Sequence, residues 1–290
     1  MRYHHPLYRP PSEAGSLLIQ ATIGCPHNRC TFCGMYAGVD FRIRPTEEVK
    51  EDLRMAHDSY GPYVKTLFFP DGNTLCMKTE ELAEILRFAR ELFPGLKRVT
   101  LYGSARFIVR KKLEGLKRLR EAGLDRIHSG FETGDGRLLE KIRKGFSPEA
   151  EVEAGELCRE AGIELSAYII IGLGGTEGSR SHALESARVL NLALPRFVRL
   201  RTLVPRPGTP VWREYHEGAF GLLSPHEALA ETRLLIESLE GPFELLSDHI
   251  SNYWNLVGKI PEDRARLLNE VDHALSLDPS SFRPALIGVL

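Results

Sequence analysis

Three cysteines lie within nine residues of one another, and no other part of the chain is as rich in soft metal ligands. They are Cys25, Cys30 and Cys33 in the segment CPHNRCTFC, directly after the apolar run 17–23. Three thiolates without a fourth can hold a metal or an iron–sulfur cluster and leave one coordination position for a molecule other than protein. An open position of this kind indicates reactivity.

A structural zinc ion is the alternative occupant of the motif. It needs a fourth protein ligand, and His27 inside the same loop is a candidate. The cysteines, however, follow the first predicted strand of a βα series, and active-site loops gather at the carboxyl ends of such strands. The position of the motif therefore favours a reactive centre over a structural zinc site.

The composition is that of an ordinary globular protein. The 290 residues are 42% hydrophobic, enough for one large α/β barrel or two domains. The 38 Lys and Arg nearly balance the 39 Asp and Glu, so no strong overall charge recruits nucleic acid or an anionic membrane. The N-terminus lacks a signal-peptide pattern, and no apolar stretch is long enough to span a bilayer. The number of cysteines, five, is odd, so they cannot all pair in disulfide bonds. We expect a cytoplasmic protein with no membrane partner, and a small molecule is a better candidate partner than nucleic acid, which stays open as the alternative.

Short β-branched runs alternate with longer helical patterns, which is typical of βα units around a parallel sheet. The predicted strands cover residues 17–23, 65–69, 98–102, 126–131, 164–171 and 197–203, and the predicted helices cover residues 47–57, 79–92, 111–122, 148–161 and 180–192. The predicted fold class is α/β, a partial (β/α)6 TIM-like barrel. We expect an N-terminal arm (1–16), a barrel core (17–210) and a helical C-terminal extension (211–290) that caps the barrel.

Period-two alternation within the strands predicts a polar barrel interior. The apolar side chains are expected to face the helices, so the other set points inward, including Tyr102 and Ser166. In the sixth strand Arg199 and Arg201 share one face. If that face points inward, the two guanidinium groups suit a carboxylate or phosphate of a substrate. Salt bridges to neighbouring strands or to a cofactor carboxylate are the alternative role.

Over residues 17–210 this pattern resembles the radical S-adenosylmethionine (radical SAM) superfamily, in which three cysteines after the first strand bind three irons of a [4Fe–4S] cluster. The amino and carboxylate groups of S-adenosylmethionine chelate the fourth iron. The resemblance implies that Cys25, Cys30 and Cys33 are cluster ligands and that Phe32 lies near the adenine. Four residues separate the first two cysteines where three are commonest, which changes the path of the loop and not the identity of the ligands.

The resemblance also implies three further cofactor contacts along the strands. The turn 70–73 stands where the superfamily meets the methionyl amino group, although a turn-forming role without a ligand is the alternative for its side chains. Glu132 matches a position that contacts the ribose or methionyl portion, with a capping or salt-bridge role as the alternative. Segment 168–172 resembles the motif that flanks the adenine. The predicted cofactor-binding set is Phe32, Asp71, Gly72, Asn73, Ser104, Glu132, Ser166, Tyr168, Ile170 and Gly172.

The implied activity is reductive cleavage of S-adenosylmethionine to a 5′-deoxyadenosyl radical, which abstracts hydrogen from an unidentified small-molecule substrate; the pair Arg199 and Arg201 makes an anionic substrate a candidate. An electron donor such as flavodoxin or ferredoxin is the implied partner. Candidates for a catalytic side chain are Tyr102, Cys76 and His249. An RNA-modifying enzyme of the same superfamily and a non-catalytic iron–sulfur or zinc binding module are the alternative functions.

Overall fold

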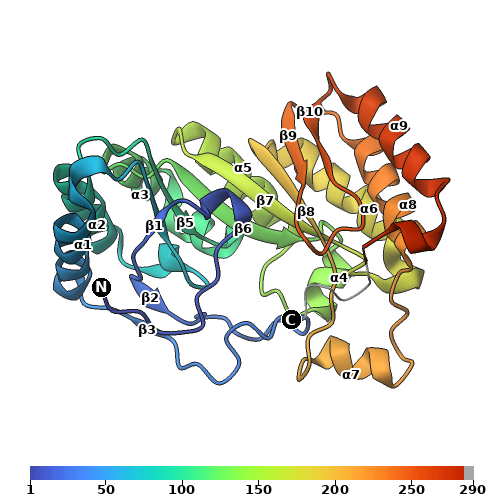
Figure 1. The fold of residues 1–290 in the computed structure, drawn as a ribbon, viewed down its shortest axis with the longest axis horizontal. Coiled ribbons are helices and arrows are strands. Elements are labelled where there is room, and N and C mark those ends of the chain that lie inside the picture. The colour runs from blue at the N-terminus through green and yellow to red at the C-terminus, as the bar shows by residue number, and fades with distance from the viewer. Residues whose placement is uncertain (284–290) are drawn as a thin grey trace. The chain divides into compact units, whose positions relative to one another are not determined.

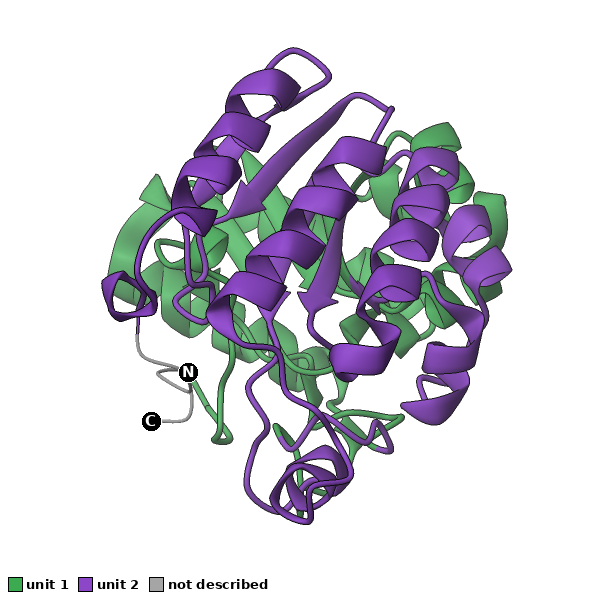
Figure 2. Ribbon diagram, turned by 90° about the vertical axis from the view of Figure 1, so that its right-hand side faces the viewer, with its two compact units in different colours: residues 1–28, 35–129, 156–165 green, residues 29–34, 130–155, 166–290 purple. Residues whose placement is uncertain are grey.

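The computed structural model describes residues 1–283, and the chain divides into two compact units (Figure 2). Unit 1 comprises residues 1–28, 35–129 and 156–165, and unit 2 comprises residues 29–34, 130–155 and the chain from residue 166 onward. One boundary falls inside the cysteine motif, so Cys25 belongs to unit 1 whereas Cys30 and Cys33 belong to unit 2.

Unit 1 contains parallel strands in the order β1-β4-β5-β6. Leu67 of β4 is opposite both Leu17 of β1 and Val99 of β5, so one row of apolar side chains crosses three strands. Its elements are η1 (Pro11–Glu13), β1 (Leu17–Leu18), β2 (Thr22–Ile23), β3 (Arg42–Ile43), α1 (Thr46–Tyr60), η2 (Gly61–Tyr63), β4 (Thr66–Phe69), η3 (Thr74–Cys76), α2 (Thr79–Leu92), β5 (Arg98–Tyr102), α3 (Ala105–Glu121) and the start of β6 (Arg126–Glu132).

The helices α1, α2 and α3 pack against one another in series (Figure 1). In α2, Leu82, Ile85, Leu86 and Ala89 recur at helical spacing, and all four are fully buried. This apolar stripe gives the helix one buried face, because residues three and four apart lie on the same side. Packing of that face, more than helix propensity, stabilises α2.

Unit 2 continues the parallel pattern in β7, β8 and β9, and β10 then pairs antiparallel with β9. The helix α6 packs against α8, and α8 packs against α9. Its elements are the end of β6, α4 (Gly136–Lys141), the start of α5 (Pro148–Glu160), most of β7 (Glu164–Ile171), α6 (Gly175–Ala193), β8 (Phe197–Thr202), α7 (Pro210–His216), α8 (Pro225–Ser238), β9 (Phe243–Ser247), β10 (Leu256–Ile260), α9 (Arg264–Leu275) and η4 (Pro279–Ser281).

The predicted α/β class and the βα alternation are confirmed. The prediction of an all-helical extension after residue 211 is wrong, because this region contains β9 and β10. In β9, Phe243, Leu245 and Ser247 are buried and alternate with more exposed residues, so the strand has period-two burial and pairs with β8. Among residues 1–283, no helix combines the length and the apolar character needed to cross a bilayer.

Several predicted boundaries also differ from the structure; for example, the helix predicted over 180–192 is α6, Gly175–Ala193. The run 17–23 is not one strand: β1 pairs with β4, and β2 pairs antiparallel with β3. The backbone carbonyls of Gln20 and Ala21, between the two strands, accept hydrogen bonds from Arg44 instead. The helix predicted to begin at residue 111 begins at Ala105, and Lys112, at a φ of 56°, interrupts it near the predicted start.

Candidate functional site

Cys25 and the turn after β4 are in direct contact within unit 1. The Gly72 N–H donates to the Gly24 carbonyl at 3.0 Å. A Cβ atom added to Gly72 would lie 2.5 Å from the Cys25 Cβ and 2.9 Å from its Sγ. Because real atoms do not approach so closely, only glycine allows this turn to lie against the cysteine. The structure therefore brings together a predicted ligand and a predicted cofactor-binding residue.

Asp71 in the same turn is buried and has a partner that the sequence analysis missed. Its Oδ2 accepts a hydrogen bond from the Gln20 side chain at 2.7 Å. Burial raises the pKa of Asp71 to about 6, although the hydrogen bond from Gln20 opposes the shift. Burial and the nearby Asp71 also raise the pKa of Tyr36 above its usual value. The only signal for Gln20 in the sequence is its polarity within an apolar run.

Asn73 and Ser104 form a reciprocal pair of hydrogen bonds. The Asn73 Nδ2 donates to the Ser104 Oγ at 2.9 Å, and the Ser104 N–H donates to the Asn73 Oδ1 at 3.4 Å. These residues follow β4 and β5, whose carboxyl ends meet at one edge because the strands are parallel. Two more residues of the predicted cofactor-binding set are thus joined.

Two predicted catalytic candidates also lie in unit 1. Cys76 ends η3, and burial raises the pKa of its thiol to about 11, against the opposing charge of Lys111. Tyr102 packs edge to face on Phe68, with ring centroids 5.1 Å apart, and its ring lies 6.0 Å from that of His128. The catalytic roles of both residues remain predictions.

The second part of the motif, the Cys30–Cys33 arc, is held within unit 2 by backbone hydrogen bonds. The Thr31 N–H donates to the carbonyl of Ile142, and the Thr31 carbonyl accepts from Val211. Phe32 and Ile170 pack against one apolar cluster, which consists of Leu138, Leu139, Ile142, Leu173, Leu203, Val211 and Phe220. The structure therefore places two residues predicted to lie near adenine around the same apolar cluster.

Glu132 forms an ion pair with Lys144, a residue that the sequence analysis did not select. The Lys144 Nζ lies 2.6 Å from the Glu132 Oε1 and 5.8 Å from the centroid of the Phe32 ring. Glu132 has a φ of 70°, and its Oε1 would lie 2.0 Å from a Cβ atom added to Gly130. Glycine at position 130 thus leaves room for the Glu132 carboxylate.

The charges around Lys144 determine its protonation. Burial lowers the pKa of Lys144, but Glu132 and the thiols of Cys30 and Cys33 outweigh burial and raise it above the usual value. Glu151 is fully buried, and neither of its carboxyl oxygens has a hydrogen-bond partner within residues 1–283. Burial raises the pKa of Glu151 well above its usual range, although Lys144 opposes the shift.

Gly172 is held by a buried carboxyl group from α8. Its N–H donates to the Glu231 Oε1 at 2.7 Å, and its φ is 81°. Burial raises the pKa of Glu231 to about 7. His182 lies 3.5 Å from Glu231 and 3.0 Å from the carbonyl of Ile170, and burial lowers its pKa to about 4. No local motif predicts that Glu231 contacts Gly172, because the two residues are 59 positions apart in the chain.

The two predicted substrate arginines lie on one face of unit 2's strands, together with two predicted cofactor residues. In the register of β7 and β8, Tyr168 is opposite Arg199 and Ile170 is opposite Arg201. The Arg199 Nε donates to the Ser166 Oγ at 3.2 Å, and the Arg201 guanidinium lies 5.2 Å from the Tyr168 ring centroid. Neither arginine forms a salt bridge with any residue of the described chain.

His249 lies in the segment after β9. Burial lowers its pKa to about 4, and the positive charge of Arg201 adds to this effect, as do Arg206 and Arg283. Its Nδ1 lies 2.8 Å from the Ser251 Oγ. The imidazole is therefore neutral at physiological pH, which makes it a proton acceptor before it becomes a donor.

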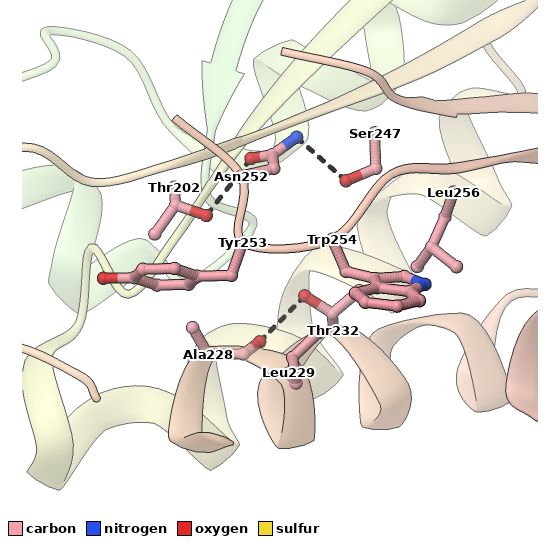
Figure 3. A pocket seen from close by; sticks show the side chains of 9 residues that line it. All are labelled: Thr202, Ala228, Leu229, Thr232, Ser247, Asn252, Tyr253, Trp254 and Leu256. Atoms are coloured by element: carbon pink, nitrogen blue, oxygen red, sulfur yellow. Dashed lines mark hydrogen bonds between the residues drawn. The ribbon is translucent and has the colours of Figure 1, made fainter. Parts of the chain in front are cut away.

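A small polar cavity lies beside this segment (Figure 3). Thr202 donates to the Asn252 Oδ1 at 3.1 Å, and the Asn252 amide donates to Ser247 at 2.8 Å. The ring of Trp254 forms another part of the lining. The cavity volume is about 10 Å³, which is room for about one water molecule and not for a substrate.

No three His, Cys, Asp or Glu side chains of residues 1–283 are gathered in the geometry of a metal site. The residues nevertheless fit an iron–sulfur cluster in two respects. Cysteine thiolates are the donors such clusters use. In addition, Gly72 puts no side chain against the Cys25 sulfur, where an added Cβ atom would lie 2.9 Å from Sγ. The assignment of the three cysteines as ligands remains a prediction.

Comparison with known proteins gives matches over most of the chain. An "uncharacterized methyltransferase" of Pyrococcus horikoshii is 27% identical over 198 residues, which are 67% of this chain and 41% of that protein. An uncharacterized protein of Methanocaldococcus jannaschii is 23% identical, over 94% of this chain and 86% of that one. The chain thus spans less than half the length of the first relative and most of the second.

The fold also matches a solved structure. The radical S-adenosylmethionine methyltransferase TsrM from Kitasatospora setae, with cobalamin and a [4Fe–4S] cluster bound, superposes with a TM-score of 0.57 at 18% identity. That match covers 91% of this chain and 53% of TsrM. The model of the "Radical SAM superfamily" matches residues 19–187, which contain all three cysteines and more than half of the chain. The chain therefore belongs to the radical SAM superfamily, whose members are enzymes that bind a [4Fe–4S] cluster and S-adenosylmethionine.

Proposed function

We propose that this enzyme cleaves S-adenosylmethionine reductively and uses the product to abstract hydrogen from an anionic small molecule. The observation that carries the proposal is the contact between Gly72 and Cys25, in a chain that belongs to the superfamily. Cys25, Cys30 and Cys33 would hold the cluster, which would supply the electron for cleavage of S-adenosylmethionine to methionine and a 5′-deoxyadenosyl radical.

Cys25, Cys30 and Cys33 are the proposed cluster ligands, and the turn after β4 receives the methionyl group. The backbone of Gly72 lies against Cys25, which is the position needed to meet a group bound beside that cysteine. Asn73 keeps a hydrogen-bonding amide in the turn because Ser104 fixes its orientation. Asp71 is buried against Gln20, so its role is to stabilise the turn more than to contact the amino group.

The residues of unit 2 are proposed to hold the adenosyl portion. Glu132 presents a carboxylate that can accept from both ribose hydroxyls. Phe32 and Ile170 offer apolar surface to the adenine, since both border one apolar cluster. Glu231 keeps the Gly172 backbone in place, and Tyr168 and Ser166 complete this face through their contacts with Arg201 and Arg199.

An anionic substrate is proposed because two arginines on one face of β8 lack carboxylate partners in the described chain. Arg199 is largely buried, and its hydrogen bond to Ser166 and its contact with the Phe197 ring supply no counter-ion. A desolvated guanidinium without a counter-ion favours a carboxylate or phosphate, which it binds through paired N–H donors. His249, neutral and close to Arg201, is the proposed proton acceptor, and Tyr102 and Cys76 are the other candidates. Flavodoxin or ferredoxin is the proposed electron donor, in a cytoplasmic setting.

The test is formation of 5′-deoxyadenosine by the anaerobically reconstituted protein with dithionite and S-adenosylmethionine. We expect slow formation alone and several-fold faster formation with the metabolite fraction that binds an anion-exchange resin. Arg201→Met should lose that acceleration, measured as the ratio to its own rate without added metabolites. No 5′-deoxyadenosine under any condition would contradict the enzymatic proposal. Acceleration by the uncharged fraction alone would contradict the anionic substrate, and salt-sensitive tRNA binding would favour an RNA-modifying enzyme.

A further inference from the structure

Lys144 is a largely buried cation that the roles proposed above leave unexplained. It lies in the loop between α4 and α5, and only 11% of its side chain is exposed. Its ammonium group pairs with Glu132 at 2.6 Å. Burial of a lysine costs free energy unless opposite charges surround it. The burial of Lys144 therefore requires negative charge nearby.

The loop that carries Lys144 is joined to the Cys30–Cys33 arc. The carbonyl of Ile142, two residues before Lys144, accepts the hydrogen bond from Thr31 at 3.0 Å. The Lys144 Nζ also lies 5.8 Å from the ring centroid of Phe32, the residue next to Cys33. Backbone and side chain therefore place the ammonium group beside the arc.

The charged or titratable groups near Lys144 include Glu132, Glu151 and the thiols of Cys30 and Cys33. Glu132 pairs with the ammonium group directly. Glu151 is fully buried and has no hydrogen-bond partner in the described chain, which favours its neutral acid form. Besides Glu132, the neighbour that the geometry gives the ammonium group is therefore the Cys30–Cys33 arc, through Phe32 and the Ile142 carbonyl.

We propose that Lys144 is a positioning residue that sets the charge beside the Cys30–Cys33 arc and makes the bound cluster easier to reduce. The inference rests on the proposed function, because it needs a cluster on the cysteines. Net charge around an iron–sulfur cluster sets its reduction potential, and a nearby cation stabilises the state with one more electron. Burial strengthens the effect because water does not screen the charge.

The test is an anaerobic redox titration of the reconstituted protein without S-adenosylmethionine, followed by electron paramagnetic resonance. Lys144→Met should move the midpoint potential to a more negative value, and Lys144→Arg should keep it close to that of the wild type. Lys141→Met is the matched control, because Lys141 is an exposed lysine at the end of α4. Its potential should not change. An unchanged potential in Lys144→Met, or an equal shift in Lys141→Met, would overturn the inference.

Glu132→Gln provides a second variant that does not depend on the folding of Lys144→Met. It removes the negative charge that pairs with Lys144, so the potential should move to a less negative value. A shift in the other direction, or none, would contradict the inference even if Lys144→Met holds no iron. The iron content of the wild type separates the two proposals: a wild type without a cluster contradicts the proposed function, whereas a wild-type cluster with unaltered variant potentials contradicts the role of Lys144 alone.

Discussion

Cys25 and the Cys30–Cys33 arc belong to one short motif, but they have different neighbours. In unit 1, Cys25 lies against the backbone of Gly72, and the adjacent Asp71 is a buried carboxyl group whose pKa is raised to about 6 by burial. In unit 2, the arc lies beside the ion pair of Lys144 and Glu132. The surroundings of the first cysteine are defined by close packing, and those of the other two by charge.

This difference indicates which kind of substitution should be tolerated near Cys25 and which near the Cys30–Cys33 arc. Close packing against backbone atoms cannot relax, so added volume near Cys25 should be costly. Charge near the arc changes electrostatic energy without changing shape, so its removal should alter reactivity more than assembly.

Removal of a proposed cluster ligand is expected to have the largest effect, because neither packing nor charge around the motif can replace the lost thiolate. Cys30→Ala should abolish cluster assembly and 5′-deoxyadenosine formation together. Cys158→Ala is the matched control, since Cys158 is a buried cysteine of α5 outside the motif. Iron analysis and the 5′-deoxyadenosine assay measure both outcomes. Retention of cluster and activity in Cys30→Ala would contradict the assignment of the ligands.

Added volume at position 72 is the sharpest test of the packing around Cys25. Gly72→Ala places a Cβ atom 2.5 Å from the Cys25 Cβ and 2.9 Å from its Cα, so the backbone must shift. We expect a loss of about 3 kcal/mol in the free energy of unfolding and at least half of the iron. Gly15→Ala is the control, because a Cβ there meets no atom within 4 Å. Full iron content in Gly72→Ala would show that the contact does not matter.

Each unit contains a buried carboxyl group with a raised pKa. The pKa of Asp71 in unit 1 is raised to about 6, and that of Glu231 in unit 2 is raised to about 7. A raised acid pKa means that the unfolded chain ionises first, so the stability that Glu231 contributes should fall as the pH rises from about 4.5 to about 7 and stay level above. The loss of that contribution should reach about 3 kcal/mol. Glu231→Gln keeps an acceptor for Gly172 and should not show this fall.

Urea unfolding at several pH values between 4 and 8 measures that difference. The gain in stability of Glu231→Gln over wild type should grow through the window and stay constant above it. A difference that does not vary with pH would mean that Glu231 stays ionised in the folded protein.

The smallest expected effect concerns α4, the helix before Ile142, whose carbonyl accepts the hydrogen bond from Thr31. Asp135 caps α4 by accepting from the N–H groups of Arg137 and Leu138, and Ile142 after that helix holds Thr31. Asp135→Ala should cost about 1 kcal/mol of unfolding free energy. Its iron content should stay near that of the wild type. A loss of iron as large as in Gly72→Ala would remove the distinction between the two surroundings.

Much of the fold could be predicted because local patterns specify it. The strands 98–102 and 164–171 and the helix 79–92 have the predicted boundaries, since their apolar periodicity is uninterrupted. The strands β9 and β10 could not be predicted in this way. Their pairing with β8 and with each other depends on contacts distant in sequence.

In the candidate site too, residues that follow from local patterns could be predicted, and residues that depend on distant partners could not. The pairing of Asn73 with Ser104 follows from strand order, and sequence reasoning selected both residues. Lys144, Glu231 and Gln20 were not selected, because a single charged or polar residue carries no motif. Their roles depend on burial and on partners 12 to 59 residues away in the chain.

The central claim is that the three-cysteine motif binds a [4Fe–4S] cluster that S-adenosylmethionine approaches directly. The most direct test is anaerobic reconstitution followed by iron and sulfide analysis and by electron paramagnetic resonance of the reduced protein. The account predicts four irons and four sulfides per chain, and a reduced-cluster spectrum that changes when S-adenosylmethionine is added. One tightly bound zinc ion, with no effect of S-adenosylmethionine on any spectrum, would contradict it.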